Sequence, residues 1–262
     1  MYVAGGLVAL ATAMPMTHKP PKAEAIEALL EQQAQWQLPF TIRSRDVVGS
    51  LGGLTNRGII FEHHGLKVLR LNAPASQRLG IDRHREWQIL HQLAPLQIAP
   101  QPVYKDANNQ ILVYEYIDGE CLGSPLNHQQ QQQVQELIQR YQKVPLKQAR
   151  FNYLAHLQHY WQHIERLGLA NSKLRNEWRA ALPKLEQFQQ GQWQGVLTHH
   201  DLQANNIVHT RSGLKILDWE YAALGHPGFD YACINQEYQD HSDALYRLRY
   251  WLEELWQLVQ NA

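Results

Sequence analysis

Residues 197–220 carry the side chains whose types and spacing could do chemistry. His199, Asp201 and Asn206 follow the pattern His-x-Asp-x-x-x-x-Asn, and Asp218 follows an apolar run twelve residues after Asn206. A carboxylate beside an acceptor hydroxyl can orient it and take its proton, and carboxylate and amide oxygens are ligands for Mg²⁺. The spacing therefore predicts phosphoryl transfer, with Asp201 as the catalytic residue and with Asn206 and Asp218 as magnesium ligands.

The same stretch allows a second interpretation. His199, His200, Asp201 and His209 could form the centre of a metal-dependent hydrolase. That interpretation gives no reason for Asn206 and leaves the upstream half of the chain unexplained. We therefore favour phosphoryl transfer, and we expect His200 and His209 to be structural or solvated.

A family resemblance rests on the same residues. The segments THHDLQANNIV and GLKILDWEYAALGHPGFDYA resemble the aminoglycoside, choline and thiamine kinases, and the order of elements agrees over residues 45–262. This resemblance implies a kinase with ATP as co-substrate, Mg²⁺ as cofactor and a small hydroxylated acceptor. It also implies supporting roles for His199, which would fix the loop, and Asp230, which would brace the loop backbone.

The resemblance places the nucleotide phosphates against the upstream half of the chain. The family has a phosphate-covering turn where this chain has SLGGLTN. Glycine lets backbone N–H groups approach phosphate closely. The residues assigned to this turn are Gly52, Gly53, Thr55 and Asn56.

Three further elements complete the expected nucleotide site. Arg70, in the strand segment KVLR, would reach the phosphates, and Lys67 would lie on the opposite face of the strand in solvent. Glu86, on the following helix, would pair with Arg70. A hinge strand would hold adenine through the backbone groups of Glu115, Tyr116 and Ile117.

Within the family the closer resemblance is to bacterial thiamine kinases. It rests on FEHHG, VLR, NIVHTRSGLKILDWEYA and the Tyr160-Trp161 helix. Thiamine carries a quaternary cation, which aromatic faces can bind by cation–π contacts. We therefore predict Glu220, Trp219 and Trp161 as acceptor-binding residues and thiamine monophosphate as the product, although tryptophans in such helices are usually core residues.

Other acceptors and one other class of protein stay open. Choline is also a quaternary alcohol, and GHPGFD is closer to the general family than to its thiamine branch. A choline or amino-alcohol kinase and an aminoglycoside O-phosphotransferase are therefore alternatives. A nucleotide-binding pseudokinase module is the alternative of another class, and its mark would be the loss of Asp201, Asn206 or Asp218.

Composition limits the partners. The chain has 262 residues, 44% of them hydrophobic, and 24 basic residues balance 24 acidic ones. Broad nucleic-acid binding and polybasic membrane docking both require a basic excess, so we expect neither partner. Cys121 and Cys233 are too isolated for a disulfide framework or a zinc site. We expect a cytoplasmic enzyme, where ATP is available, and the oligomeric state does not follow from the sequence.

The sequence and the resemblance together predict an α+β, two-lobed protein-kinase-like fold. Residues 1–22 would be a tail, either disordered or from a misassigned start, with a signal peptide or an ordered element as alternatives. Residues 23–117 would form the nucleotide-binding lobe, with a small antiparallel sheet and the hinge strand. Residues 118–262 would form a larger helical lobe with the catalytic loop and the acceptor site.

Periodicity places the individual elements. Strands are expected in an antiparallel meander over 46–61 and 66–71, in the hinge strand 111–117, and as two short runs within 196–218. The expected helices cover 23–37, 77–93, 128–142, 153–167, 173–189 and 241–260.

Overall fold

The first part of the molecule is a five-stranded antiparallel sheet. The computed structural model describes residues 23–260 except 53–55, 77, 237 and 239–241, so the expectations for residues 1–22 lie outside it. The strand order is β1-β2-β3-β5-β4, which confirms the expected meander and adds the hinge strand beside β3. The strands are β1 Val47–Gly52, β2 Asn56–Glu62, β3 Leu66–Asn72, β4 Pro102–Lys105 and β5 Ile111–Glu115.

The two faces of this sheet have different tasks. Ile59 pairs with Leu69, which pairs with Val113, and all three are buried on the face covered by the N-terminal segment. Arg70 is one residue out of phase with Leu69 and therefore points to the opposite face. Lys67 shares the face of Leu69 and therefore lies opposite Arg70, as predicted.

The expectation of a solvated Lys67 is wrong. Its side chain and backbone are together only 8% exposed, and its Nζ donates to the carbonyl oxygen of His64 at 3.4 Å. A lysine can bury its aliphatic stem while its ammonium finds an acceptor at the edge of the sheet. The charge is therefore held beside the β2–β3 turn and away from the face of Arg70.

Two helices are shorter than expected. Helix α1 covers Ala23–Leu30, and a 3₁₀ turn follows at Gln33–Trp36. The left-handed Gln37 ends this turn, and the Gln33 side chain bonds to the backbone of Ile42. Helix α2 covers Arg83–Leu93 rather than 77–93, since the left-handed Gly80 interrupts it and Asp82 caps its start.

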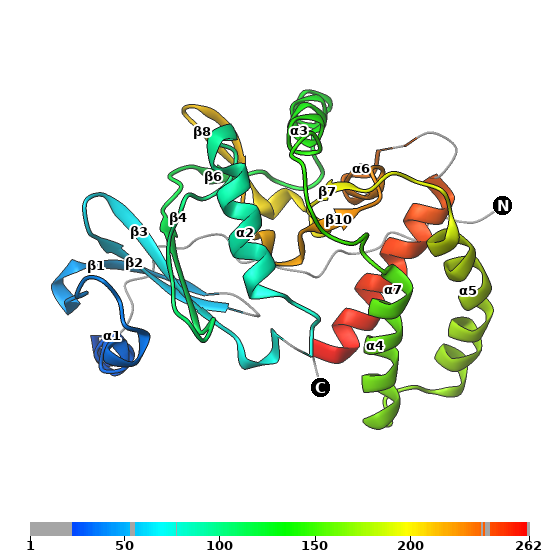
Figure 1. Ribbon diagram of the computed structural model, residues 1–262, viewed down its shortest axis with the longest axis horizontal. Helices are drawn as coiled ribbons and strands as arrows, with labels where there is room; N and C mark the ends of the chain where they lie inside the picture. The colour runs from blue at the N-terminus through cyan, green and yellow to red at the C-terminus, as the bar shows by residue number, and fades with distance from the viewer. Residues whose placement is uncertain (1–22, 53–55, 77, 237, 239–241, 261–262) are drawn as a thin grey trace.

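The second part of the molecule is mainly helical, as expected (Figure 1). A core cluster joins α4, α5 and α7, and the glutamine run in α3 lies at the partly or fully exposed surface. The four long helices fall within one residue or two of their predicted ranges. They are α3 His128–Tyr141, α4 Tyr153–Arg166, α5 Ser172–Gln190 and α7 Ser242–Gln260, and the short α6 covers Phe229–Cys233.

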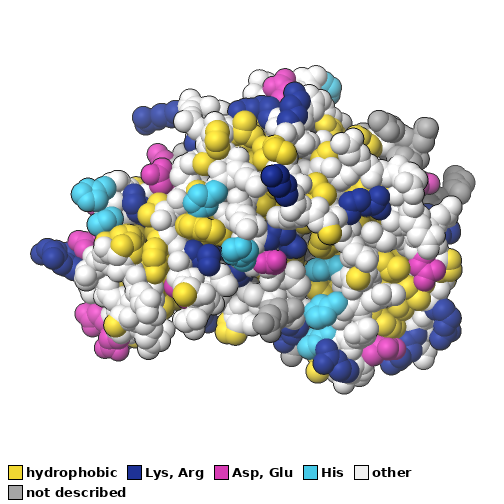
Figure 2. Space-filling model, in the orientation of Figure 1, with side chains coloured by type: hydrophobic (Ala, Val, Ile, Leu, Met, Phe, Trp, Pro, Cys, Tyr) yellow, Lys and Arg dark blue, Asp and Glu magenta, His cyan; other side chains and the backbone are white. Residues whose placement is uncertain are grey.

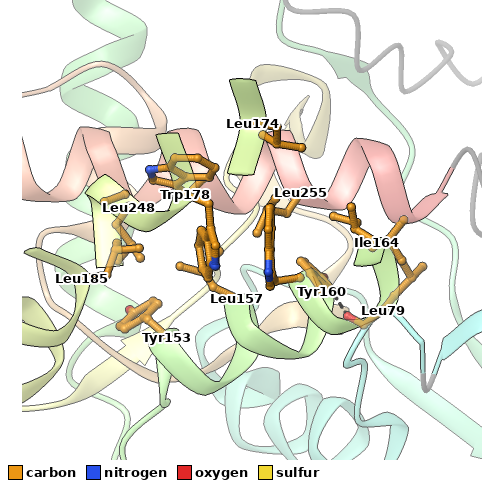
Figure 3. Packing of buried hydrophobic residues seen from close by; sticks show 14 of the residues in the cluster. Leu79, Tyr153, Leu157, Tyr160, Ile164, Leu174, Trp178, Leu185, Leu248 and Leu255 are labelled. Carbon is orange, nitrogen blue, oxygen red and sulfur yellow. Dashed lines mark hydrogen bonds between the residues drawn. The ribbon is translucent and has the colours of Figure 1, made fainter. Parts of the chain in front are cut away.

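The segment before α2 is anchored in the helical part. Leu79 and Ile81 belong to the same buried cluster as the α4 and α7 side chains. Figure 3 shows Leu79 beside Tyr160, whose hydroxyl donates to the Leu79 carbonyl at 2.8 Å. His159 adds a bond from Nε2 to the carbonyl oxygen of Arg78 at 3.0 Å. These contacts fix the start of α2 relative to the helices.

Two small sheets hold the segments that carry the predicted catalytic residues. Strands β7 (Val196–Thr198) and β10 (Ala223–Gly225) pair with each other, while β8 (Ile207–Thr210) lies between β6 (Glu120–Cys121) and β9 (Gly213–Ile216). The loop after β7 and the segment after β9 therefore leave neighbouring sheet edges. Their polar side chains come together at the same place.

The visible surface has no concentrated basic area. Figure 2 shows Lys and Arg side chains scattered over the face in view, which agrees with the balanced charge of the sequence. Among the residues that the structure describes, no helix is both long and apolar enough to cross a membrane.

The cap of α2 gives a stability prediction. The Asp82 carboxylate accepts from the N–H groups of His84 and Arg85, both at 3.0 Å. Replacing Asp82 by Ala should lower the free energy of unfolding by about 1 kcal/mol, because two helix-end donors lose their acceptor. Urea denaturation measures this, and Asp82→Asn, which keeps an acceptor, should stay close to the wild type. Equal losses in both variants would contradict a capping role.

Candidate active site

Asp230 fixes the backbone of the loop that follows β7. Its carboxylate, which is fully buried, accepts the N–H groups of His199 at 2.7 Å and His200 at 3.0 Å. The hydroxyl of Tyr141 donates to the same carboxylate at 2.6 Å. A buried carboxylate with three donors has a rigid position. Asp230 thus lies where the predicted bracing role requires it.

His199 is held as a neutral ring. Its Nε2 lies 2.8 Å from the carbonyl oxygen of Leu217, which can only accept, so this nitrogen carries the proton. Its Nδ1 then accepts the N–H of Asp201 at 3.2 Å. Burial lowers the pKa of His199, although Asp230 opposes this shift. The ring joins the two loops, in agreement with the prediction that it fixes the loop.

Asp201 and Asn206 meet side by side. The amide nitrogen of Asn206 donates to the Asp201 carbonyl at 2.9 Å and to its carboxylate at 3.1 Å, which leaves the amide oxygen as the free donor atom for a metal. Gln203, which the sequence analysis missed, donates to the other carboxylate oxygen at 2.7 Å. Burial raises the pKa of Asp201 to about 6, Glu220 and Glu253 add to the rise, and the bonds from Gln203 and Asn206 oppose it.

Asp218 lies near Arg70 and within electrostatic reach of Asp201. Its backbone is left-handed with φ of 58°, and its side chain remains 35% exposed. Burial, together with the charges of Glu220, Glu86 and Asp201, raises its pKa well above the usual range, even though Arg70 lies 3.7 Å away.

This excess of negative charge suits a cation. The Asn206 amide oxygen and the Asp218 carboxylate are hard oxygen donors, and Mg²⁺ is commonly held by only one or two protein carboxylates with waters and phosphates. The described residues hold no group of three or more His, Cys, Asp and Glu side chains placed to bind a metal. The donor set therefore fits Mg²⁺ shared with a nucleotide rather than a metal held by protein alone.

A buried line of alternating charges begins at Arg70, next to Asp218. Arg70 Nη2 lies 2.6 Å from Glu86, and Arg83 Nη1 lies 3.1 Å from Glu86 and 2.7 Å from Glu220. Burial opposes the charge of Glu86, but the two guanidinium groups outweigh it and lower its pKa. The predicted Arg70–Glu86 pair is therefore present. Sequence reasoning missed Arg83, although its position three residues before Glu86 on a helix was a signal.

The predicted acceptor residues lie deeper than expected. Trp219 is 1% exposed and donates its indole N–H to the Ile216 carbonyl, and Trp161 is 9% exposed and stacks on Trp178. Glu220 is 2% exposed and pairs with Arg83. These positions correct the expectation that the three side chains would be free to face a cation, because tight packing and ion pairing already use them.

Other aromatic side chains are affected by the charge of Asp201. The indole of Trp256 donates to the Tyr221 hydroxyl at 2.8 Å. Burial raises the pKa of both Tyr160 and Tyr221, and the charges of Glu220 and Asp201 add to both shifts. These aromatic residues therefore lie within electrostatic reach of Asp201, which the sequence pattern alone did not indicate.

The predicted phosphate-covering turn is only partly described, whereas the predicted hinge is described in full. Gly52 ends β1 and Asn56 begins β2, while Gly53 and Thr55 lie outside the described residues. The N–H of Glu115 donates to Gln101, and that of Tyr116 donates to Leu66. Within the described residues, the N–H of Ile117 reaches no backbone acceptor, which makes it the donor of the three best placed for a base.

A pocket of about 300 Å³ borders the hinge on the side of the β8–β9 turn. It is lined by Ala99 and Gln101, by the hinge residues Glu115–Asp118, and by Thr210, Arg211, Ser212 and Lys215. Arg70, Asp201, Asn206 and Asp218 are not part of this lining. The pocket is therefore not lined by the predicted catalytic and metal-binding side chains.

Comparison with known proteins now gives the family. The sequence model of the phosphotransferase enzyme family (APH) matches residues 50–258. The chain belongs to this family. The expectation of an enzyme that transfers phosphoryl groups is therefore confirmed.

Relatives and solved structures agree with this membership. The chain is 28% identical over 221 residues to the thiamine kinase of Escherichia coli O1:K1, covering 80% of this chain and 74% of that protein. The choline kinase LicA from Streptococcus pneumoniae shares the fold with a TM-score of 0.69 at 17% identity, over 90% and 91% of the two chains. The GDP and kanamycin complex of APH(2")-IIIa has a TM-score of 0.54 at 18% identity, over 89% and 86%. The predicted kinase-like α+β fold is confirmed.

The buried line of charges gives a second stability prediction. Replacing Arg83 by Met should lower the free energy of unfolding by about 3–5 kcal/mol, because Glu86 and Glu220 lose a buried partner. The matched control is Lys173→Met, since Lys173 is 83% exposed and pairs with Glu177 only at 3.9 Å. That control should change stability by less than about 1 kcal/mol in the same denaturation measurement. Similar losses in the two variants would contradict the stabilising role of the buried line.

Proposed function

We propose that this phosphotransferase moves the γ-phosphoryl group of ATP to the hydroxyl of a small cationic alcohol, with thiamine as the acceptor and thiamine monophosphate as the product. The observation that carries the proposal is the proximity of two pairs, Asp201 with Asn206 and Asp218 with Arg70, in which the charge of Asp201 acts on Asp218. Asn206 lies 3.1 Å from the Asp201 carboxylate, and Arg70 lies 3.7 Å from Asp218. These are the groups that positioning and charge stabilisation of a phosphoryl group require.

Each group has a distinct task. Asp201, with its pKa raised to about 6, accepts the proton of the acceptor hydroxyl and orients it. Arg70, fixed by Glu86, faces the phosphates. Asn206 and Asp218 would hold Mg²⁺, which neutralises phosphate charge when bound. The Ile117 N–H is the expected contact of the nucleotide base.

Thiamine is favoured over other acceptors by sequence similarity. Proteins named thiamine kinase match 80% of this chain at 26–28% identity. Solved neighbours named choline kinase or complexed with kanamycin are only 17–18% identical and support the fold alone. Choline and aminoglycosides are the next candidates. A pseudokinase is disfavoured because Asp201, Asn206 and Asp218 are all present.

An acceptor screen tests this proposal. ADP formation with Mg²⁺ and ATP is measured with thiamine, choline, ethanolamine and kanamycin in parallel, and thiamine should give the highest kcat/KM. Asp201→Asn should lower kcat on the order of 100- to 10,000-fold with a similar KM for ATP. A higher kcat/KM for another alcohol would show that the acceptor is wrong. ADP formation that Asp201→Asn leaves unchanged would overturn the proposed chemistry.

The two cations of β3 give a matched pair of variants. Arg70→Ala should raise the KM for ATP, because Arg70 faces the cleft beside Asp218. Lys67→Ala should leave this KM close to the wild-type value, because Lys67 lies on the opposite face and contacts His64. Steady-state kinetics at saturating acceptor distinguish the two. The reverse ranking would show that the phosphates lie on the other face of the sheet.

A further inference from the structure

His200, the residue before Asp201, has a backbone and a ring that are both constrained. Its φ is 69°, a left-handed conformation that is uncommon outside glycine and is maintained only where surrounding contacts enforce it. The hydrogen bond from the His200 N–H to Asp230 explains this backbone conformation. The ring has contacts of its own that the phosphotransferase chemistry does not require.

The ring of His200 is bonded on both sides. Its Nδ1 lies 3.1 Å from the Tyr221 carbonyl oxygen, and its Nε2 lies 2.8 Å from the Tyr153 hydroxyl. A carbonyl only accepts, so Nδ1 carries the proton and Nε2 accepts from the hydroxyl. Tyr153 also accepts the N–H of His226 at 2.8 Å, so its hydroxyl is used in both directions. One neutral tautomer satisfies every partner.

The surroundings leave this ring little freedom. Phe151 and Phe229 lie against it with ring centroids 4.8 and 5.1 Å away. A Cβ atom at Gly225 would overlap both the His200 ring and the Tyr153 hydroxyl, so a residue without a side chain is needed there. Burial, with Arg85, His156 and His199 nearby, lowers the pKa of His200 well below its usual value. The ring therefore stays neutral and fixed.

These contacts join three segments that are distant in the sequence. Tyr153 begins α4, His200 precedes the catalytic Asp201, and Tyr221 follows Asp218 by three residues. One imidazole therefore fixes the loop of Asp201 relative to the segment of Asp218 and to the helical part of the molecule. A catalytic group that is displaced by about 1 Å can lose on the order of 100-fold in rate.

We propose that His200 is a positioning residue for Asp201, and that the hydrogen bond from the Tyr153 hydroxyl to its ring keeps the catalytic carboxylate at the acceptor hydroxyl. The inference rests on the proposed kinase function. It gives a specific role to His200, the middle residue of the His-x-Asp motif, which the sequence predicted only to be structural or solvated.

Two variants break the same hydrogen bond from opposite sides. Tyr153→Phe removes only the hydroxyl, which donates to His200 and also accepts the N–H of His226. In His200→Asn, asparagine tolerates the left-handed backbone and can still donate toward Tyr221, but it is too short to reach Tyr153. Each variant should lower kcat about tenfold and change the KM for ATP by less than about twofold. The double variant should lose less than the two single losses combined, because both variants remove the bond between Tyr153 and His200.

The decisive measurement repeats these substitutions in the Asp201→Asn background. If His200 acts through the Asp201 carboxylate, neither change should lower the remaining rate there. Tyr250→Phe is the matched control, because Tyr250 is 42% exposed on α7, and it should leave kcat unchanged. If thermal melting shows that His200→Asn does not fold, Tyr153→Phe carries the test alone.

Three results would overturn the inference. The first is a kcat that both variants leave unchanged when the wild type is active. The second is a loss of kcat in the Asp201→Asn background that equals the loss in the wild-type background. The third is a change in the KM for ATP without any loss of kcat. A wild-type protein that forms no ADP with any acceptor would instead refute the proposed function, so the two failures are distinguishable.

Discussion

Several carboxylates are buried around the loop that carries Asp201, and the rest of the structure depends on how their negative charge is balanced. Glu86 and Glu220 are each 2% exposed, and Asp230 is fully buried. A buried charge is costly unless it is paired or hydrogen-bonded. Arg70 and Arg83 balance the first two, and backbone N–H groups with the Tyr141 hydroxyl stabilise Asp230. Burial raises the pKa of Asp230 as well as those of Asp201 and Asp218, but only for the last two does the nearby charge of Glu220 add to the rise.

This added negative charge around Asp201 and Asp218 is what makes the site suited to chemistry. A group whose pKa lies near the working pH can take a proton and release it again. A carboxylate that lacks a full partner favours a bound cation. The pairs of Glu86 and Glu220 with Arg70 and Arg83 are buried, whereas Asp218 has Arg70 only at 3.7 Å. This difference between paired and incompletely paired carboxylates follows from Arg83, which pairs with Glu86 and Glu220 at the same time.

Neutral histidines fix the loops where more charge would be unfavourable. His199 links the Asp201 loop to Leu217, and His200 links it to Tyr221. Both rings are kept neutral by burial, and each donates one N–H to a backbone carbonyl. Two short loops, each with a single 3₁₀ turn, thereby acquire defined positions. The helical part contributes through Tyr141 and Tyr153, so its packing also determines the geometry of the cleft.

Local pattern determined much of this protein. The spacing of His199, Asp201, Asn206 and Asp218 predicted a phosphotransferase, strand alternation predicted opposite faces for Arg70 and Lys67, and helical periodicity placed α3, α4, α5 and α7 closely. These features depend on the few residues on either side of each position, which a sequence displays directly. The start of α2 was missed because a left-handed glycine and a cap override periodicity over 77–82.

Only the tertiary structure decided which side chains are free to act. Glu220 and Trp219 follow Asp218 directly in the chain, yet an arginine 137 residues away pairs with the first, and core packing encloses the second. Lys67 is buried by its neighbours in space although a lysine at a strand end is typical of a solvated position. Tyr153 and His200 meet across 47 residues. Burial and pairing are sums over residues that are distant in sequence, so a sequence can name the chemical groups but cannot state which of them remain unpartnered.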